Sequence, residues 1–247
     1  MTTHQVVTRE EWEVARGELL EREKEHTWAA DDLARARREL PWVAIEKDYV
    51  LDAGDGSCTL AELFDGRSQL LVYHFMFGPS YEAGCPTCSS MVDGVVGLLP
   101  HLHARDLTVA LVSTAPPEAL QAYRRRMGWA IPWFSSANSE FSRDMGASFP
   151  VEQMRENMPP VADLPPIASQ NAAATGTGIA EYIAEMPTAN AFNLDEGTVY
   201  QTYATTARGV EFLMGYYPIL DRSPNGRDEP DSTFQTWLRR RDEYEAA

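Results

Sequence analysis

The strongest hydrophobic pattern in the chain is the run at residues 69–77, which is apolar apart from Gln69 and His74. A nearly continuous apolar run of this length is typical of a central strand covered on both faces. After this run, helical and strand patterns alternate along the chain. They predict a helix at 85–105, a strand at 107–113, a helix at 117–127 and a strand at 129–135. This order predicts a parallel sheet with helices on both faces.

Charged positions dominate the first 40 residues. Thr8 and Glu11 have the spacing of a capping box, which predicts a helix over residues 8–25. A second helical stretch over residues 28–40 ends at Pro41, because proline cannot continue a helix. This arm holds too few apolar side chains for a core of its own. We expect it to pack on the main domain or on a second subunit, which would make the protein a homodimer.

Prolines interrupt the pattern at residues 145–180, which predicts an insertion or lid. Short β-rich runs at residues 191–194 and 198–203 then flank Asp195-Glu196-Gly197, a typical hairpin turn. Helical patterns at residues 208–217 and 232–244 close the chain.

A length of 247 residues suits one α/β domain with insertions and arms, and a hydrophobic content of 44% is enough for a sizeable core. The predicted parts are an N-terminal helical arm (1–40), an α/β domain with the insertion (41–229) and a C-terminal helix (230–247).

The net charge of −16 argues against a nucleic-acid partner, because an acidic protein repels the phosphate backbone. The runs of arginine lie in helical patterns beside carboxylates, which is typical of a solvated helix face. We therefore expect no nucleic-acid partner. No apolar run approaches the roughly 20 residues of a membrane-spanning helix. The charged N-terminal region is unlike a signal peptide. We therefore expect a cytoplasmic protein with no membrane partner.

Cys85-Pro86-Thr87-Cys88 is the motif that carries the most chemistry. Three cysteines without a signal peptide argue against a disulfide framework, and a close pair in a reducing compartment is typical of redox or metal sites. At a helix start, backbone N–H groups and the helix dipole favour the thiolate of Cys85, which makes it the expected nucleophile. Cys88, one turn later, is the expected resolving thiol. Cys58 is interpreted as a partly buried bystander.

His74 keeps a metal alternative open. It lies on the predicted central strand, which leads directly into the cysteine loop. Two sulfurs and an imidazole suit Cu(I) or Zn, so His74, Cys85 and Cys88 form a candidate metal site without an obvious fourth ligand. A buried structural histidine is the competing interpretation.

Aromatic and basic side chains supply candidate substrate contacts. Trp129 and Trp133 could line a pocket beside the cysteines, although aromatic residues in a strand are more often core. Arg126, Arg143 and Arg208 could hold an anionic substrate, although surface ion pairs are the commoner role. A non-redox biosynthetic enzyme that reuses the aromatic pocket is therefore a further alternative.

The order of elements resembles the thioredoxin-like fold with peroxiredoxin-type additions. Met186-Pro187-Thr188 precedes the hairpin, where thioredoxin-like proteins place a cis-proline whose backbone faces the cysteines. The resemblance implies that Pro187 belongs to the catalytic site and that Thr188 contacts substrate. A trans-proline at the start of an edge strand gives the same pattern. Because Ala83 stands where a peroxidase would need a hydroxyl, we do not predict a standard peroxidase.

More closely, the chain resembles domain-of-unknown-function family 899, a bacterial thioredoxin-like group whose predicted activity is dithiol–disulfide oxidoreduction. The resemblance runs from about Trp42 to Glu229. The segments that carry it are residues 63–70, 73–79, 84–89, 126–129, 132–136, 207–209 and 226–229. Two positions depart from the family pattern, since Thr114 stands in place of an arginine and Gln201 in place of a histidine.

The sequence thus predicts a thioredoxin-like α/β fold with flanking helices and a thiol–disulfide oxidoreductase that uses Cys85 and Cys88. This hypothesis requires no cofactor and expects a small-molecule or protein disulfide as substrate. A copper- or zinc-binding protein or metalloenzyme is the first alternative. Fold alone does not decide between them.

Overall fold

The computed structural model describes residues 4–230 and 233–245 and divides the chain between Pro41 and Trp42 into two compact units. The first unit contains one continuous helix, α1 (Arg9–Arg38), rather than the two helices predicted. No proline or glycine stands at the expected break, so nothing interrupts the helix there. Thr8 and Glu11 form the predicted capping box, with the Glu11 N–H donating to Thr8 Oγ1 at 3.2 Å.

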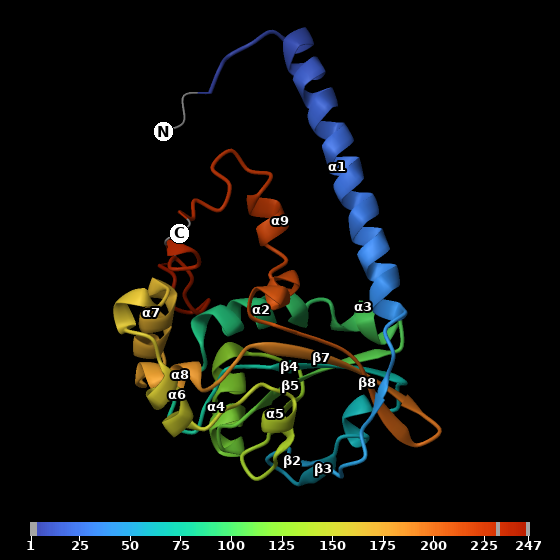
Figure 1. The fold of residues 1–247 in the computed structure, drawn as a ribbon, viewed down its shortest axis with the longest axis vertical. Coiled ribbons are helices and arrows are strands. Elements are labelled where there is room, and N and C mark those ends of the chain that lie inside the picture. Colours follow the sequence, from blue (N-terminus) through green and yellow to red (C-terminus); the bar gives the residue numbers. More distant parts are fainter. Residues whose placement is uncertain (1–3, 231–232, 246–247) are drawn as a thin grey trace. The chain divides into compact units, whose positions relative to one another are not determined.

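The second unit is built on an eight-stranded sheet in the order β1-β8-β7-β4-β5-β6-β2-β3 (Figure 1). Its strands are β1 (Val43–Ala44), β2 (Val50–Asp52), β3 (Ser57–Thr59), β4 (Gln69–His74), β5 (Leu107–Ser113), β6 (Trp133–Ser135), β7 (Thr188–Asp195) and β8 (Thr198–Thr206). The three strands β4, β5 and β6 are parallel, and the β7–β8 hairpin runs antiparallel beside β4. The predicted thioredoxin-like α/β fold is confirmed.

Two hydrophobic clusters form because successive side chains of β4 point to opposite faces. Tyr73 belongs to the larger cluster, which also holds Cys85 and Cys88. Leu70 and Val72 belong to the smaller one. The period of two therefore fixes which β4 side chains can approach the cysteines.

The second unit also contains α-helices and 3-10 helices. They are η1 (Glu62–Phe64), α2 (Pro86–Val96), α3 (Leu99–His103), α4 (Pro117–Met127), α5 (Phe141–Asp144), α6 (Val151–Asn157), η2 (Val161–Asp163), α7 (Pro166–Ala174), α8 (Ile179–Ile183), η3 (Ala207–Leu213) and α9 (Tyr217–Leu220). None of those in the described part of the chain is long and apolar enough to cross a bilayer.

The predicted insertion is a cluster of short helices. Helices α6, α7 and α8 gather beside the start of α2 (Figure 1). Pro150, Pro160 and Pro165 each occupy the residue before a helix rather than breaking one. The prolines that made this segment look irregular are therefore helix starts.

The C-terminal prediction is wrong. Instead of a helix over 232–244, residues 234–237 and 241–244 form turns and bends, no α-helix occurs among the described residues 233–245, and Ser232 lies outside the described residues. Leu238 and Arg240 are nevertheless buried, so the segment is part of the domain. Long-range contacts of these two side chains override the local helical pattern.

His74 is a polar residue in the smaller cluster. Its ring stacks on Phe141 with 5.4 Å between centroids, and neither ring nitrogen has a hydrogen-bond partner among the described residues. Burial lowers the pKa of His74 to about 3, because the charged form would lose its hydration. The ring therefore stays neutral in the folded protein.

This neutral histidine predicts an acid-sensitive free energy of unfolding. The unfolded chain binds the proton more tightly than the folded one, so the stability is complete above about pH 6.5 and declines as pH falls toward about 3. The slope from this group is at most about 1.4 kcal/mol per pH unit. Between pH 7.5 and 4.5, the free energy of unfolding measured in urea should fall by roughly 3 kcal/mol less for His74→Leu than for wild type. His101→Leu, at an exposed position, is the control, and equal losses in both variants would contradict this assignment.

Candidate active site

The cysteine loop is fixed between the end of β4 and the start of α2. Cys85 is the residue before α2, Pro86 occupies its first turn, and the Cys85 N–H donates to the carbonyl of Met76 at 3.1 Å. Gly84 packs against Phe75, whose ring would lie 2.6 Å from any added Cβ. A larger residue at position 84 would therefore displace the loop.

Cys85 is buried yet favours the thiolate. Burial acts to raise its pKa, but hydrogen-bond donors outweigh it: the Cys88 thiol, the Tyr182 hydroxyl at 3.4 Å, and the backbone N–H groups of Cys88 and Thr87. The net pKa of the Cys85 thiol is lowered to about 7. This is the expected effect of unpaired N–H groups at a helix start.

Cys88 has the opposite character. Burial raises its pKa well above the ordinary value, and the adjacent negative charge on Cys85 raises it further. Cys85 is therefore the first of the pair to lose its proton as pH rises through about 7, whereas Cys88 stays a thiol. Cys58 lies apart from them on β3, and burial raises its pKa to about 11.

The insertion supplies two site residues that the sequence did not predict. Asn171 on α7 donates through Nδ2 to Tyr182 Oη at 3.0 Å and to Thr87 Oγ1 at 3.1 Å, and lies 3.7 Å from Cys85 Sγ. Tyr182 comes from α8. Both are separated from Cys85 by more than 80 residues, and no local pattern marks them.

A cavity of about 310 Å³ opens at the cysteines. Its lining is mostly apolar, from the cysteine loop, the insertion, the β7 approach and the C-terminal segment. These residues include Met76, Cys85, Cys88, Met91, Leu164, Ile167, Ala168, Asn171, Tyr182, Glu185, Pro187, Arg208, Glu211 and Phe234. We call this space the cysteine pocket.

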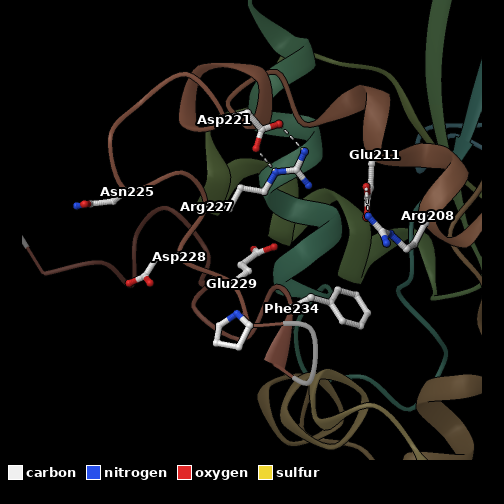
Figure 2. A pocket seen from close by; sticks show the side chains of 9 residues that line it. Arg208, Glu211, Asp221, Asn225, Arg227, Asp228, Glu229 and Phe234 are labelled. Atoms are coloured by element: carbon white, nitrogen blue, oxygen red, sulfur yellow. Dashed lines mark hydrogen bonds and ion pairs between the residues drawn. The ribbon is translucent and has the colours of Figure 1, made fainter. Parts of the chain in front are cut away.

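A second, polar cavity of about 540 Å³ adjoins the cysteine pocket, with Arg208, Glu211 and Phe234 lining both. Figure 2 shows two separate ion pairs in it, Arg208 with Glu211 and Arg227 with Asp221. Arg208 is the one predicted anion-binding candidate that reaches the cysteine pocket, and its guanidinium is already paired.

Pro187 lines the cysteine pocket as expected, but its peptide bond is trans, since no cis bond occurs in the described residues. Of the two alternatives that the sequence left open, the structure therefore has the trans-proline directly before β7. Thr188 is buried at the start of β7, where its hydroxyl donates to the Met186 carbonyl at 3.2 Å. It is not among the described residues that line the pocket.

The two predicted tryptophans are core residues. Trp129 donates to Asp93 Oδ1 at 2.7 Å, and Trp133, 1% exposed, donates to Ser113 Oγ at 3.0 Å. Arg126 pairs with Asp242 at 2.7 Å on the surface. None of the three is among the described residues that line the cysteine pocket, so the predicted contact of these tryptophans with a substrate beside the cysteines is wrong.

His74 does not meet the cysteines. It packs in the smaller cluster on Phe141, whereas Cys85 and Cys88 belong to the larger cluster. Within residues 4–230 and 233–245, no three His, Cys, Asp or Glu side chains converge as metal ligands. The combination of His74, Cys85 and Cys88 as copper or zinc ligands is therefore wrong, because the period of the strand separates the imidazole from the sulfurs.

Thr114, one of the two residues that depart from the family pattern, is hydrogen-bonded to Glu185, which lines the cysteine pocket. Thr114 and Ser148 donate to its carboxylate at 2.7 and 3.0 Å. Burial still raises the pKa of Glu185 to about 7. Gln201, the other departure, donates to Asn190 at 2.7 Å and is not among the described pocket residues.

Arg240 ties the C-terminal segment to the site. Its buried guanidinium donates to the Gly84 carbonyl at 2.9 Å and to the Ala174 carbonyl at 2.7 Å, and pairs with Glu243 at 2.6 Å. One side chain thus joins the cysteine loop, the end of α7 and the C-terminal turns.

Residues 1–244 match the family described as "Bacterial protein of unknown function (DUF899)". The chain belongs to this family. No curated protein matches the DUF899 chain.

Solved structures similar to this DUF899 protein include Xanthomonas campestris peroxiredoxin Q (14% identity, 73% of this chain and 96% of that chain, TM-score 0.45). Others are a Xylella fastidiosa peroxiredoxin Q mutant (13%, 70% and 89%, 0.44) and the Mycobacterium tuberculosis peroxidoxin BcpB (10%, 71% and 94%, 0.40). Similarity at this level carries no information about activity.

The contact between Tyr182 and Cys85 predicts the pH dependence of thiol reactivity. In a Cys58→Ser background, the rate of iodoacetamide alkylation of Cys85 should rise with a midpoint near pH 7. Tyr182→Phe removes one donor to the thiolate, so the midpoint should move up by roughly one pH unit. Tyr49→Phe removes a hydroxyl that bonds Asp144 instead, and its midpoint should stay at the wild-type value. Equal midpoints in all three proteins would refute the role of Tyr182.

Arg240→Met should destabilise the DUF899 protein by roughly 3 kcal/mol, because it leaves the buried carbonyls of Gly84 and Ala174 without their cationic donor and removes one of the two arginines that pair with Glu243. Hydrogen exchange should rise at residues 84–88 and 171–176. Arg239→Met, at the exposed neighbouring position, is the matched control. Exchange that rises only within residues 233–245 would show that the contacts to Gly84 and Ala174 contribute nothing.

Proposed function

We propose that this protein is a thiol–disulfide oxidoreductase in which Cys85 is the nucleophile and Cys88 the resolving thiol. The observation that carries the proposal is the buried Cys85 sulfur at the start of α2, which accepts hydrogen bonds from Tyr182 Oη at 3.4 Å and from Asn171 Nδ2 at 3.7 Å. The Cys88 thiol and the first backbone N–H groups of α2 add to this stabilisation and lower the pKa of Cys85 to about 7. Such a site supplies a thiolate near neutral pH with its resolving partner already in contact.

The reaction follows from the unequal protonation of the pair. The Cys85 thiolate attacks one sulfur of a disulfide R–S–S–R, which forms a Cys85–S–S–R bond and releases RS⁻. Cys88 then loses its proton and attacks the Cys85 sulfur, which releases the second RS⁻. The products are the Cys85–Cys88 disulfide, one RS⁻ and one RSH, and the two cysteines have given two electrons to the substrate.

Proton removal from Cys88 is the demanding step, because its pKa is raised by burial and by the charge on Cys85. That charge disappears once Cys85 is joined to the substrate, so the first step itself makes Cys88 easier to ionise. The order of events is therefore set by the electrostatics of the pair.

Single-cysteine variants test the assignment. Prereduced Cys88→Ser should accumulate the Cys85–S–S–R species on exposure to a small disulfide, visible by intact mass, because no resolving thiol remains. Cys85→Ser should lose at least about 100-fold in the rate of RSH release, as expected when the activated nucleophile is removed. The matched control is Cys58→Ser, which should keep the wild-type rate since Cys58 lies on β3 away from the pocket.

Two outcomes would refute the proposal. The first is a Cys85 that forms no mixed disulfide in the Cys88→Ser protein. The second is a wild-type protein in which oxidation never produces the Cys85–Cys88 disulfide.

A further inference from the structure

Access to the sulfurs is the first constraint on the substrate. Cys85 and Cys88 are each 1% exposed and lie in the cysteine pocket of about 310 Å³, which falls at the small end of small-molecule sites. The attacked sulfur must reach bonding distance of Cys85, about 2.05 Å. Its flanking atoms must therefore enter the pocket beneath α7 and α8. A disulfide held in a folded polypeptide brings much more bulk than this volume admits.

The charge of the pocket is the second constraint. The cation among its described lining residues is Arg208, and Glu211 holds it at 2.8 Å. Glu185, the buried carboxyl group in the lining, receives hydrogen bonds from Thr114 and Ser148. The remaining lining side chains are mostly apolar. A carboxylate beside the reacting sulfur would therefore lose its hydration next to the Cys85 thiolate, while the cation of the pocket is already paired. An ammonium group would also lose its hydration, and the lining carboxyl groups of Glu185 and Glu211 already have partners in Thr114, Ser148 and Arg208.

Asn171 is the third constraint and points to one ligand group. It is 1% exposed, it lines the pocket, and its Oδ1 has no hydrogen-bond partner among the described residues. Its Nδ2 faces Cys85, Thr87 and Tyr182, the orientation that suits a thiolate acceptor. A buried acceptor of this kind calls for an O–H or N–H donor.

We propose that the cysteine pocket selects a small, uncharged organic disulfide that carries an O–H or N–H group close to its sulfur, and that Asn171 Oδ1 accepts the hydrogen bond from that group. This inference rests on the proposed function and adds the class of substrate to it. The chemistry is the exchange already described, in which the disulfide gains two electrons and the Cys85–Cys88 disulfide forms.

A matched pair of disulfides isolates the hydrogen bond. Hydroxyethyl disulfide carries an O–H where propyl disulfide carries a CH₃, and the two are similar in size. The rate of RSH release from prereduced protein is measured with each, and the ratio of the two rates is compared between wild type and Asn171→Leu. Any change in the thiolate fraction of Cys85 cancels in this ratio.

Asn171→Leu should lower the hydroxyethyl-to-propyl ratio about fivefold, the value of one typical hydrogen bond. An unchanged ratio would overturn the role of Asn171. Ala168→Leu tests the pocket independently, because Ala168 lines it and the added volume should slow hydroxyethyl disulfide at least tenfold. Ala173→Leu, exposed on the same helix, should react at the wild-type rate. Equal rates in both alanine variants would refute the pocket as the binding site.

Substrate size gives the last comparison. Rates with hydroxyethyl disulfide and with the disulfides of folded insulin are each divided by the rate of free dithiothreitol with the same substrate. The normalised rate should be at least tenfold higher for hydroxyethyl disulfide. Equal or reversed values would overturn this inference and leave the proposed function standing. No Cys85–Cys88 disulfide with either substrate would instead refute the proposed function.

Discussion

The stabilisation of a thiolate inside an apolar core is the constraint on which the site depends. Cys85 is 1% exposed, so its negative charge requires hydrogen bonds that replace water. The first turn of α2 supplies two N–H groups and the Cys88 thiol, and α8 supplies the Tyr182 hydroxyl. Asn171 on α7 positions that hydroxyl. The short helices of the insertion therefore supply hydrogen-bond partners to the Cys85 sulfur as well as part of the pocket wall.

The same constraint explains how distant parts of the chain are joined. Gly84 leaves room for the ring of Phe75, and its carbonyl accepts from Arg240 near the C-terminus. Arg240 also holds the end of α7 through Ala174. A cation placed here satisfies carbonyls of the loop and the insertion together, which fixes the two walls of the pocket relative to each other.

The polar side chains of Tyr73 and His74, which are adjacent on β4, lie on opposite faces of the sheet. Tyr73 faces the cysteine cluster, whereas His74 stacks on Phe141 in the other cluster. The neutral buried imidazole belongs to the stability of the core, and the sulfurs are left with hydroxyl, amide and backbone partners. This division keeps the imidazole of His74 away from the sulfurs of Cys85 and Cys88.

The sequence by itself determined the features that depend on local pattern. These are the parallel strands, the hairpin at Asp195-Glu196-Gly197, the capping box at Thr8 and the placement of Cys85 at a helix start. Each depends on a few neighbouring residues, so periodicity, turn residues and caps suffice to find it. The prediction that the pocket is lined by Trp129, Trp133 and Thr188 is wrong. The order of residues along the chain does not determine which side chains face the cavity and which pack in the core.

Only the tertiary structure decided the partners of the thiolate. Asn171, Tyr182 and Arg240 lie 86, 97 and 156 residues from the loop residue that each contacts. Separations of this size are set by how the insertion and the C-terminal turns pack on the sheet, and no local rule encodes them. The motif therefore indicated the two sulfurs of the proposed site, whereas packing between remote segments set their hydrogen-bond partners, their burial and the size of the cavity beside them.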